Sequence, residues 1–558
     1  MVVDFHGVVP AWWSHGRRSA KTLRLWPWIA AVSTGLLSGA CFAPFSQTWL
    51  CWISLTPLLA ALWFSGGHSK RRSLRDLALG WAAGIPFFWT VFWWLRTVTV
   101  PGWFLGGFYF GLYFALWAWI AGRLRPRSPN ESELTASPWL RSSRNLLLAF
   151  LLASAWVTQE ALRSVIFSGW GWNTLGSALH GQWALIQITE YTGVAGLSFL
   201  TAFANVIALA TVKRFIVEVQ VRRMRAHFDL TLTMIGIVAV GAFGLHALQT
   251  HRPSRPVRVA LVQANIPRED KFAPQSAAKI FETFQRLSAP AVDSAPRPDL
   301  IVWPESSMPG PVLGDQASYD FVMNFSVRAK TDLLLGTIDF DDATHVYNAA
   351  MLVGDGGKRT DVYRKVHLVP FGEYIPGRHF IPLLAAIVGD QVPDDFAFGK
   401  EYSVFGLTNG GTKIAPLICF EDTIGDLTRQ FVLGGAVLLA NVTNDGWFLR
   451  SAGSQQHIDN AVFRCVETRR PMVRAANTGV TCFINEFGRI THQLLDEQGS
   501  QFTDGVLTGD AMVPLVPELT FYVRHGEVFA EGCMVVTLLA LAIGLLNATR
   551  KRRALPSS

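Results

Sequence analysis

Eight long apolar segments constrain this 558-residue chain more than any other feature of its sequence. A helix needs about 20 mostly apolar residues to cross the hydrocarbon core of a bilayer. Only helices and closed barrels satisfy their backbone polar groups there, and these segments are too long for barrel strands. We therefore expect eight transmembrane helices, at approximately residues 25–45, 49–64, 77–95, 103–121, 146–162, 186–212, 230–248 and 529–546.

The distribution of basic residues predicts how these helices are oriented. Lys and Arg gather before the first segment, in alternate loops and after the eighth, a pattern typical of cytoplasmic loops. Both termini are then cytoplasmic, and residues between the seventh and eighth helices lie outside. Since the clusters flank apolar segments, the net charge of +8 indicates contact with membrane lipids and not with nucleic acid. The clusters include Arg17 and Arg18, Lys70 and Arg71, Arg141 and Arg144, Lys213 and Arg214, and Arg552 and Arg553.

The segment between the last two helices has a different composition. It contains short apolar runs rich in β-forming residues, at 257–266, 299–303, 332–338, 348–353, 413–419 and 437–442, with helical stretches at 275–287 and 455–468. Continuous apolar strands that alternate with helices predict a layered α/β domain with sheets buried on both faces. We expect three parts: a seven-span transmembrane domain (1–250), an external α/β domain (251–522), and an eighth helix with a basic cytoplasmic tail (523–558).

Three motifs in this segment carry reactive side chains. Residues 301–305 read IVWPE, so a proline ends the strand and Glu305 projects from it. Residues 363–374 read YRKVHLVPFGEY and contain Lys365. Residues 414–422 read IAPLICFED, in which a strand leads directly into Cys419. A protonated thiol needs a base to become a nucleophile, and the oxyanion formed by its attack needs a positive charge. Glu305 and Lys365 supply these two functions.

These motifs, in this order, resemble the nitrilase superfamily, whose members use a Glu–Lys–Cys triad on an α-β-β-α sandwich. The resemblance extends through NDGWF at 444–448, Arg464, Glu467 and NTG at 477–479. With eight spans and the domain inserted before the last one, the whole chain resembles the apolipoprotein N-acyltransferase family. FAPF at 42–45 and GVAGLSF at 193–199 agree with that family in the membrane half. Phe420 departs from it, since we expect Tyr to be common there.

The resemblance implies a reaction in two half-steps. Cys419 takes an acyl chain from a phospholipid, for which phosphatidylethanolamine is the expected donor, and forms a thioester. The N-terminal amine of an S-diacylglyceryl-cysteine in an apolipoprotein then accepts the chain, which is the last step of lipoprotein maturation. The implied location is the inner membrane of a bacterium, with the catalytic domain in the periplasm. No metal or nucleotide motif is present, so we expect neither a metal nor a cofactor.

Further residues are expected to support the triad of Glu305, Lys365 and Cys419. Glu373 and Glu421 are expected to orient Lys365 or to shuttle protons. Trp447 and Phe420 are expected to contact the substrate, and the apolar stretch 379–388 to dip into the outer leaflet or to form a buried helix.

Several alternatives stay open at the level of sequence. A membrane-tethered hydrolase of the nitrilase or amidase type would use the same triad with water as the acceptor. A non-catalytic scaffold that kept the fold is a second alternative. Glu160 and Arg163 lie one turn apart on the fifth predicted helix, either as a structural ion pair or as a contact to a lipid head group. Cys465 and Cys482 are either small buried residues or a disulfide.

Overall fold

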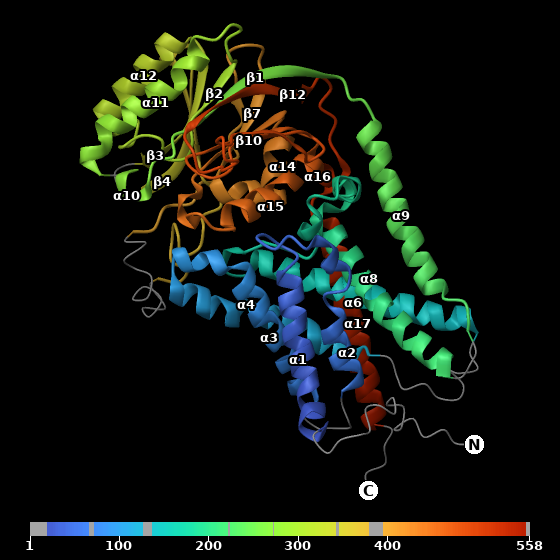
Figure 1. The fold of residues 1–558 in the computed structure, drawn as a ribbon. Coiled ribbons are helices and arrows are strands. Elements are labelled where there is room, and N and C mark those ends of the chain that lie inside the picture. Colours follow the sequence, from blue (N-terminus) through green and yellow to red (C-terminus); the bar gives the residue numbers. More distant parts are fainter. Residues whose placement is uncertain are drawn as a thin grey trace, which may run out of the picture.

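The computed structural model describes residues 19–65, 72–125, 137–220, 224–271, 273–341, 345–378 and 394–553. A bundle of helices forms one half of the molecule, and a domain of two sheets with flanking helices forms the other (Figure 1). The apolar stretch 379–388, which was expected to contact lipid or to form a buried helix, lies outside the described residues.

Helices occupy all eight of the predicted apolar segments. They are α1 (Ser19–Gly39), α2 (Thr56–Phe64), α3 (Arg72–Val91), α4 (Val100–Arg123), α6 (Pro138–Val165), α8 (Thr189–Gln220), α9 (Phe228–Gln249) and α17 (Val528–Arg553). Five of them, α4, α6, α8, α9 and α17, are long and apolar enough to cross a membrane. The second segment contains a turn of 3₁₀ helix, η3 (Thr48–Trp52), and then α2. At 1.5 Å per residue α2 is only about 14 Å long.

Two six-stranded sheets form the core of the other half. The first has the order β12-β1-β2-β3-β4-β5 and the second the order β11-β10-β9-β8-β7-β6. The first sheet consists of β1 (Ser254–Gln263), β2 (Leu300–Val302), β3 (Asp332–Asp341), β4 (His345–Gly354), β5 (Arg359–Arg364) and β12 (Gly505–Pro514). The second consists of β6 (Phe405–Gly406), β7 (Lys413–Ile418), β8 (Leu438–Thr443), β9 (Met472–Ala476), β10 (Cys482–Ile484) and β11 (Ile490–Gln493).

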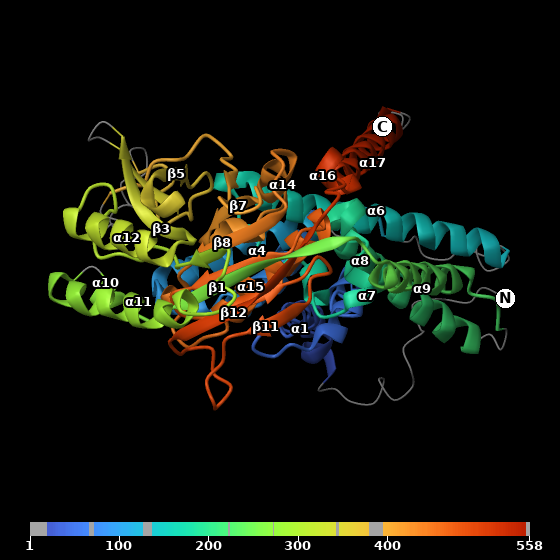
Figure 2. The same cartoon turned by 90° about the horizontal axis from the view of Figure 1, so that it is seen from above.

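Alternating side chains on β1 explain how the layers stack. Val259 and Leu261 belong to the core between the two sheets, whereas Ala260 and Val262 pack with the outer helices. These outer helices are α11 (Ala277–Val292) and α12 (Gln316–Ala329). On the second sheet, α14 (Gly425–Leu433) packs against β7, and His457 of α15 (Gly453–Thr468) bonds to Arg474 of β9. The predicted α-β-β-α sandwich is therefore confirmed. Seen from above, β1 and β12 run side by side across the domain, in an antiparallel pair from Ser254–Pro514 to Gln263–Gly505 (Figure 2).

Gln456 on α15 joins the sandwich to the helical half through four buried hydrogen bonds. Its Oε1 accepts from the indole N–H of Trp94 at 3.1 Å and of Trp172 at 3.0 Å, and from Nδ2 of Asn173 at 3.0 Å. Its Nε2 donates to the carbonyl of Ala43 at 2.7 Å. Because buried polar groups need partners, this single side chain fixes three separate segments of the helical half against α15.

Glu160 and Arg163 do not form the ion pair that was one reading of their spacing. Glu160 Oε1 accepts from the backbone N–H of Leu175 at 2.7 Å and from the indole of Trp156 at 2.9 Å. Arg163 donates to the carbonyl of Trp172 at 2.6 Å. Both side chains are buried and hold residues 172–175, which contact Gln456, so their role here is structural.

We expect the substitution Gln456→Ala to weaken the junction between the two halves. It leaves two indoles and one amide buried without an acceptor, at a cost of about 1–3 kcal/mol for each unpaired group. The thermal unfolding midpoint in detergent should fall by several degrees. Gln455→Ala is the matched control, because among the described residues the one side-chain partner of Gln455 is Asp459 on the same helix. Equal midpoints for the two variants would refute this role of Gln456.

Candidate active site

The three residues of the predicted triad meet at one cavity. Glu305 follows β2, Lys365 follows β5 and Cys419 follows β7, and all three line a cavity of about 770 Å³. The cavity lies between the sandwich and the helical half, since side chains from both contribute to its wall. Its apolar wall includes Leu105, Tyr109 and Phe110 of α4 together with Ile166 and Phe167 after α6. A reactive polar end and a long apolar wall suit a substrate that carries an acyl chain.

Glu305 has one carboxylate oxygen that is free to accept a proton. Its Oε1 accepts from Nδ2 of Asn348 at 2.8 Å, while Oε2 is buried and has no partner among the residues that the structure describes. The backbone carbonyl of Glu305 accepts from Nζ of Lys271 at 2.6 Å. Gly336 packs closely against the backbone of Glu305, because a Cβ atom added to Gly336 would lie 2.5 Å from the Cα atom of Glu305. The main chain of Glu305 is thus fixed on two sides.

Lys365 is a buried ammonium held by a carboxylate. Its side chain is 1% exposed, and Nζ lies 2.8 Å from Oε2 of Glu373. Burial lowers the pKa of Lys365, but the negative charges of Glu373, Glu305 and Glu421 outweigh burial and raise it above its usual value. Lys365 therefore stays positively charged where an oxyanion would form. Asn348 also donates to Oε1 of Glu373 at 2.6 Å, so one amide connects the carboxylates of Glu373 and Glu305.

Cys419 occupies a sharp turn at the end of β7. Its φ of 51° lies in the left-handed region, which a non-glycine residue adopts only where the surrounding structure enforces it. The amide of Asn441 on β8 donates to its carbonyl at 2.9 Å and helps to hold the turn. Burial, followed by the charge of Glu305, raises the pKa of the Cys419 thiol, although Lys365 opposes this. The thiol is protonated at neutral pH and needs a base to react.

Glu421 positions the segment that carries Lys365. Its Oε1 accepts from the Tyr363 hydroxyl at 2.8 Å and from the backbone N–H groups of Val366 and His367 at 2.9 and 3.1 Å. Its Oε2 accepts from the N–H of Ile418 at 2.9 Å. Burial raises the pKa of Glu421 to about 7 against the opposing charge of Lys365. Glu421 connects the turn at Cys419 to the loop after β5, which fits the orienting role expected from the sequence.

Phe420 and Trp447 both line the cavity, but in different ways. Phe420 stacks on Trp170 with ring centroids 4.7 Å apart and on Trp172 at 5.8 Å. The Phe420 ring therefore packs against the helical half and also forms part of the cavity wall. Trp447 lies under the guanidinium of Arg268, whose Cζ is 3.6 Å from its ring centroid.

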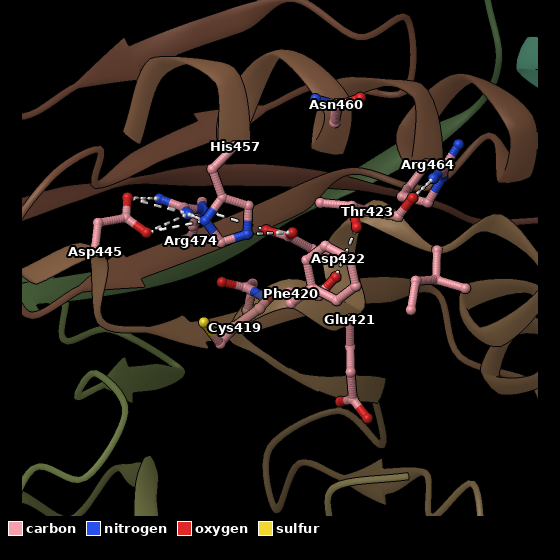
Figure 3. A network of polar contacts seen from close by, with 12 residues as sticks. Cys419, Phe420, Glu421, Asp422, Thr423, Asp445, His457, Asn460, Arg464 and Arg474 are labelled. Carbon is pink, nitrogen blue, oxygen red and sulfur yellow. Dashed lines mark hydrogen bonds and ion pairs between the residues drawn. The ribbon is translucent and has the colours of Figure 1, made fainter. Parts of the chain in front are cut away.

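A buried cluster of charges supports the turn at Cys419 from behind. His457 on α15 lies 2.9 Å from Asp422 Oδ1 through Nε2 and 2.9 Å from Asp445 Oδ1 through Nδ1. Arg474 on β9 also bonds to both carboxylates, at 3.3 and 3.2 Å (Figure 3). Burial lowers the pKa of His457, but Asp422 and Asp445 outweigh burial and Arg474 and raise it to about 9. In Figure 3 Glu421 points away from this cluster.

The sequence reasoning did not identify Lys271, Asn348 or His457. Burial lowers the pKa of Lys271 to about 8 against the charge of Glu305, and the residue lines the cavity. A buried Asn inside a predicted strand (348–353) was the one local signal for Asn348. His457 lies in a stretch that is correctly predicted as a helix, so nothing local marks it as a partner of Asp422.

The described His, Cys, Asp and Glu side chains do not gather into a metal site. Among the described residues, no group of three or more His, Cys, Asp or Glu side chains could hold a metal ion. Cys465 and Cys482 are both buried and free, so the alternative of a disulfide between them is wrong.

The charge cluster predicts a pH dependence of stability. Because folding raises the pKa of His457, its contribution is complete below about pH 6.5, the usual value, and is lost as the pH rises through about 9. We expect His457→Gln to lower the unfolding midpoint by several degrees at pH 6 and by much less at pH 10. His492→Gln, at an exposed site on β11, is the control. A constant difference between wild type and His457→Gln over this range would contradict the assignment.

Known proteins resemble this chain over both of its halves. Residues 34–207 match the family model described as apolipoprotein N-acyltransferase N-terminal domain, and residues 258–516 match carbon-nitrogen hydrolase. The apolipoprotein N-acyltransferase of Geobacter metallireducens is 31% identical over 92% of this chain and 95% of its own length. That of Chlorobaculum tepidum is 30% identical over 94% and 97%.

Among solved structures, an amidase of the nitrilase superfamily from Nesterenkonia AN1 covers 50% of this chain and 97% of its own, with 16% identity and a TM-score of 0.36. The two family models and the length of the matches to both relatives settle the family. The chain belongs to the apolipoprotein N-acyltransferase family and carries a nitrilase-superfamily domain in its second half.

Proposed function

We propose that this protein is an apolipoprotein N-acyltransferase that moves a fatty acyl chain from a phospholipid, through a thioester on Cys419, to the N-terminal amine of a diacylated lipoprotein. The observation that carries the proposal is the cavity that the sandwich and the helical half form together. Its polar end holds Glu305, Lys365 and Cys419, and its apolar wall comes from helices of the membrane half. A substrate that stays anchored in lipid can reach such a cavity through its acyl chain.

The first half-reaction uses all three residues. Oε2 of Glu305 takes the proton from Sγ of Cys419, and the thiolate attacks the carbonyl carbon of the phospholipid ester. The negative oxygen of the tetrahedral intermediate is stabilised by the ammonium of Lys365. When the intermediate collapses, the C–O bond breaks and the alkoxide takes the proton from Glu305. The products are a lysophospholipid and an acyl thioester.

The second half-reaction runs through the same groups. The α-amine of the lipoprotein's S-diacylglyceryl-cysteine attacks the thioester carbonyl, and Glu305 takes the proton that the nitrogen loses. The C–S bond then breaks, and Glu305 returns the proton to the sulfur. The amide product leaves and the thiol is restored, so no cofactor is required.

We propose the topology that the charge pattern predicts: eight spans, cytoplasmic termini and a periplasmic sandwich in a bacterial inner membrane. Trp94 and Thr97, just before α4, bond to the sandwich, so Arg123 at the other end of α4 is about 36 Å away. Arg163 near the end of α6 holds a segment that bonds to Gln456, so Arg141 and Arg144 are also remote from it. The basic ends of α4 and α6 thus lie away from the sandwich, which supports this orientation under the positive-inside rule.

We also propose the three-part division at residues 1–250, 251–522 and 523–558. It is supported by the end of α9 at Gln249, the start of β1 at Ser254 and the start of α17 at Val528.

Mass spectrometry of the intact protein tests the proposed reaction. After incubation with phosphatidylethanolamine, the expected donor, and no acceptor, the wild type should gain the mass of one acyl chain, and neutral hydroxylamine should remove it. Cys419→Ala should gain nothing. A diacylated lipopeptide should then discharge the adduct. Steady release of free fatty acid without an adduct would instead favour the hydrolase that uses water, and an adduct only with other phospholipids would change the donor.

Replacement of the base tests the role of Glu305. We expect Glu305→Gln to slow thioester formation by roughly 10²–10⁴-fold, the usual contribution of a general base. Glu282→Gln, an exposed site on α11, is the matched control and should acylate at the wild-type rate. If Glu305→Gln forms the thioester as fast as the control, another group is the base.

A further inference from the structure

Arg268 lines the cavity, and its positive charge forms no ion pair with a carboxylate among the described residues. It begins the short helix α10 (Arg268–Lys271) and lines the cavity together with Trp447. Among the residues that the structure describes, no carboxylate lies within 4.0 Å of its guanidinium and no hydrogen bond satisfies it. Partial burial lowers its pKa, and the charge of the adjacent Glu269 acts in the opposite direction. The group stays protonated, because an arginine pKa lies far above neutral pH.

Trp447 holds this guanidinium in a defined orientation. The Cζ atom lies 3.6 Å from the centre of the indole ring, a distance at which one face of the guanidinium is covered. The N–H groups at the edge of the plane are left available. Such a planar, pre-oriented fork is suited to two parallel hydrogen bonds with a phosphate or carboxylate.

The position of the pair favours a ligand that comes from the membrane. The carbonyl of Trp447 accepts from Oγ1 of Thr97 at 2.9 Å, and Thr97 ends the 3₁₀ helix η4 (Trp93–Thr97) just before α4. Arg268 and Trp447 therefore lie where the sandwich meets the outer ends of the membrane helices. Nearby, Arg96 stacks on Trp93 at 4.1 Å, in the arrangement that is common at the level of lipid head groups.

We propose that Arg268, held against the face of Trp447, binds the phosphodiester of the phospholipid donor. This assignment rests on the proposed function and makes it more specific. An acyl chain packed on the apolar wall, which includes Leu105 and Phe110, leaves the phosphate to the polar residues that line the same cavity, of which Arg268 is one. The diacylglyceryl-cysteine acceptor contains no phosphate, so Arg268 acts in the first half-reaction and not in the second.

The test measures the two half-reactions separately in the full-length enzyme. In Arg268→Gln, the phospholipid concentration that gives half-maximal thioester formation should rise about tenfold or more, which corresponds to the loss of a hydrogen bond to a charged group. Discharge of a preformed thioester by a diacylated lipopeptide should keep its wild-type rate. Arg450→Gln is the matched control, because Arg450 is exposed, lies 5.7 Å from the Phe502 ring and does not line the cavity. Slowing of both half-reactions, or of neither, would overturn the assignment.

A donor without phosphate separates charge recognition from damage to the site. A p-nitrophenyl acyl ester should acylate Arg268→Gln as fast as the wild type, and equal loss with both donors would overturn the proposal. Inorganic phosphate distinguishes the source of the ligand. If it inhibits the p-nitrophenyl ester reaction in the wild type but not in Arg268→Gln, the site takes free phosphate and the assignment to lipid fails.

Failure of the proposed function has a different signature. If the wild type forms no thioester with any phospholipid, the acyl-transfer proposal fails. The phosphate site is then tested by measuring phospholipid binding alone. Phospholipid should then bind Cys419→Ala more tightly than it binds the double variant Cys419→Ala/Arg268→Gln. Equal binding to these two proteins would overturn the site as well.

Discussion

The buried ammonium of Lys365 is the charge on which the rest of the site depends. An unpaired charge in a site that excludes water costs several kcal/mol, so Lys365 requires Glu373, 2.8 Å away. Glu373 in turn shares Asn348 with Glu305, which links the placement of the base to the placement of the cation. Glu421 holds the loop of Lys365 to the strand that ends at Cys419. The three groups therefore cannot move independently.

The membrane half does more than anchor the enzyme. Trp170 and Trp172 stack on Phe420, the residue next to Cys419, and Trp94 and Trp172 bond to Gln456, the residue next to His457. The wall of the cavity on this side is built from these aromatic rings and from α4. A sandwich on its own would open the turn at Cys419 to water and weaken every electrostatic interaction in the site. This dependence gives a physical reason for a helical bundle where one anchoring helix would suffice for attachment.

Local features of the sequence predicted a layered α/β domain and candidate residues at its strand ends, because strand ends marked by Pro304 or by the run into Cys419 are local. The α-β-β-α arrangement and the grouping of those residues into a triad came from the resemblance to the nitrilase superfamily. The pairing of β1 with β12 was not predictable in this way, since it joins residues about 250 positions apart and its register depends on the packed core. Glu160 shows the same limit: a spacing of one turn suggested an ion pair, but its partner is the backbone of Leu175. Lys271 and His457 acquire their roles only from tertiary neighbours.

The geometry also bears on why an amine, and not water, accepts the acyl chain. Attack by water requires water to occupy a cavity whose wall is mostly aromatic and aliphatic. An acceptor that is anchored in the same leaflet reaches the thioester at a high effective concentration, which offsets the entropy of bringing two large molecules together. In the proposed mechanism Glu305 accepts the proton in both half-reactions, and its Oε2 is available for this because it has no other partner among the described residues. Selection between water and amine thus follows from access to the cavity, while the catalytic groups remain unchanged.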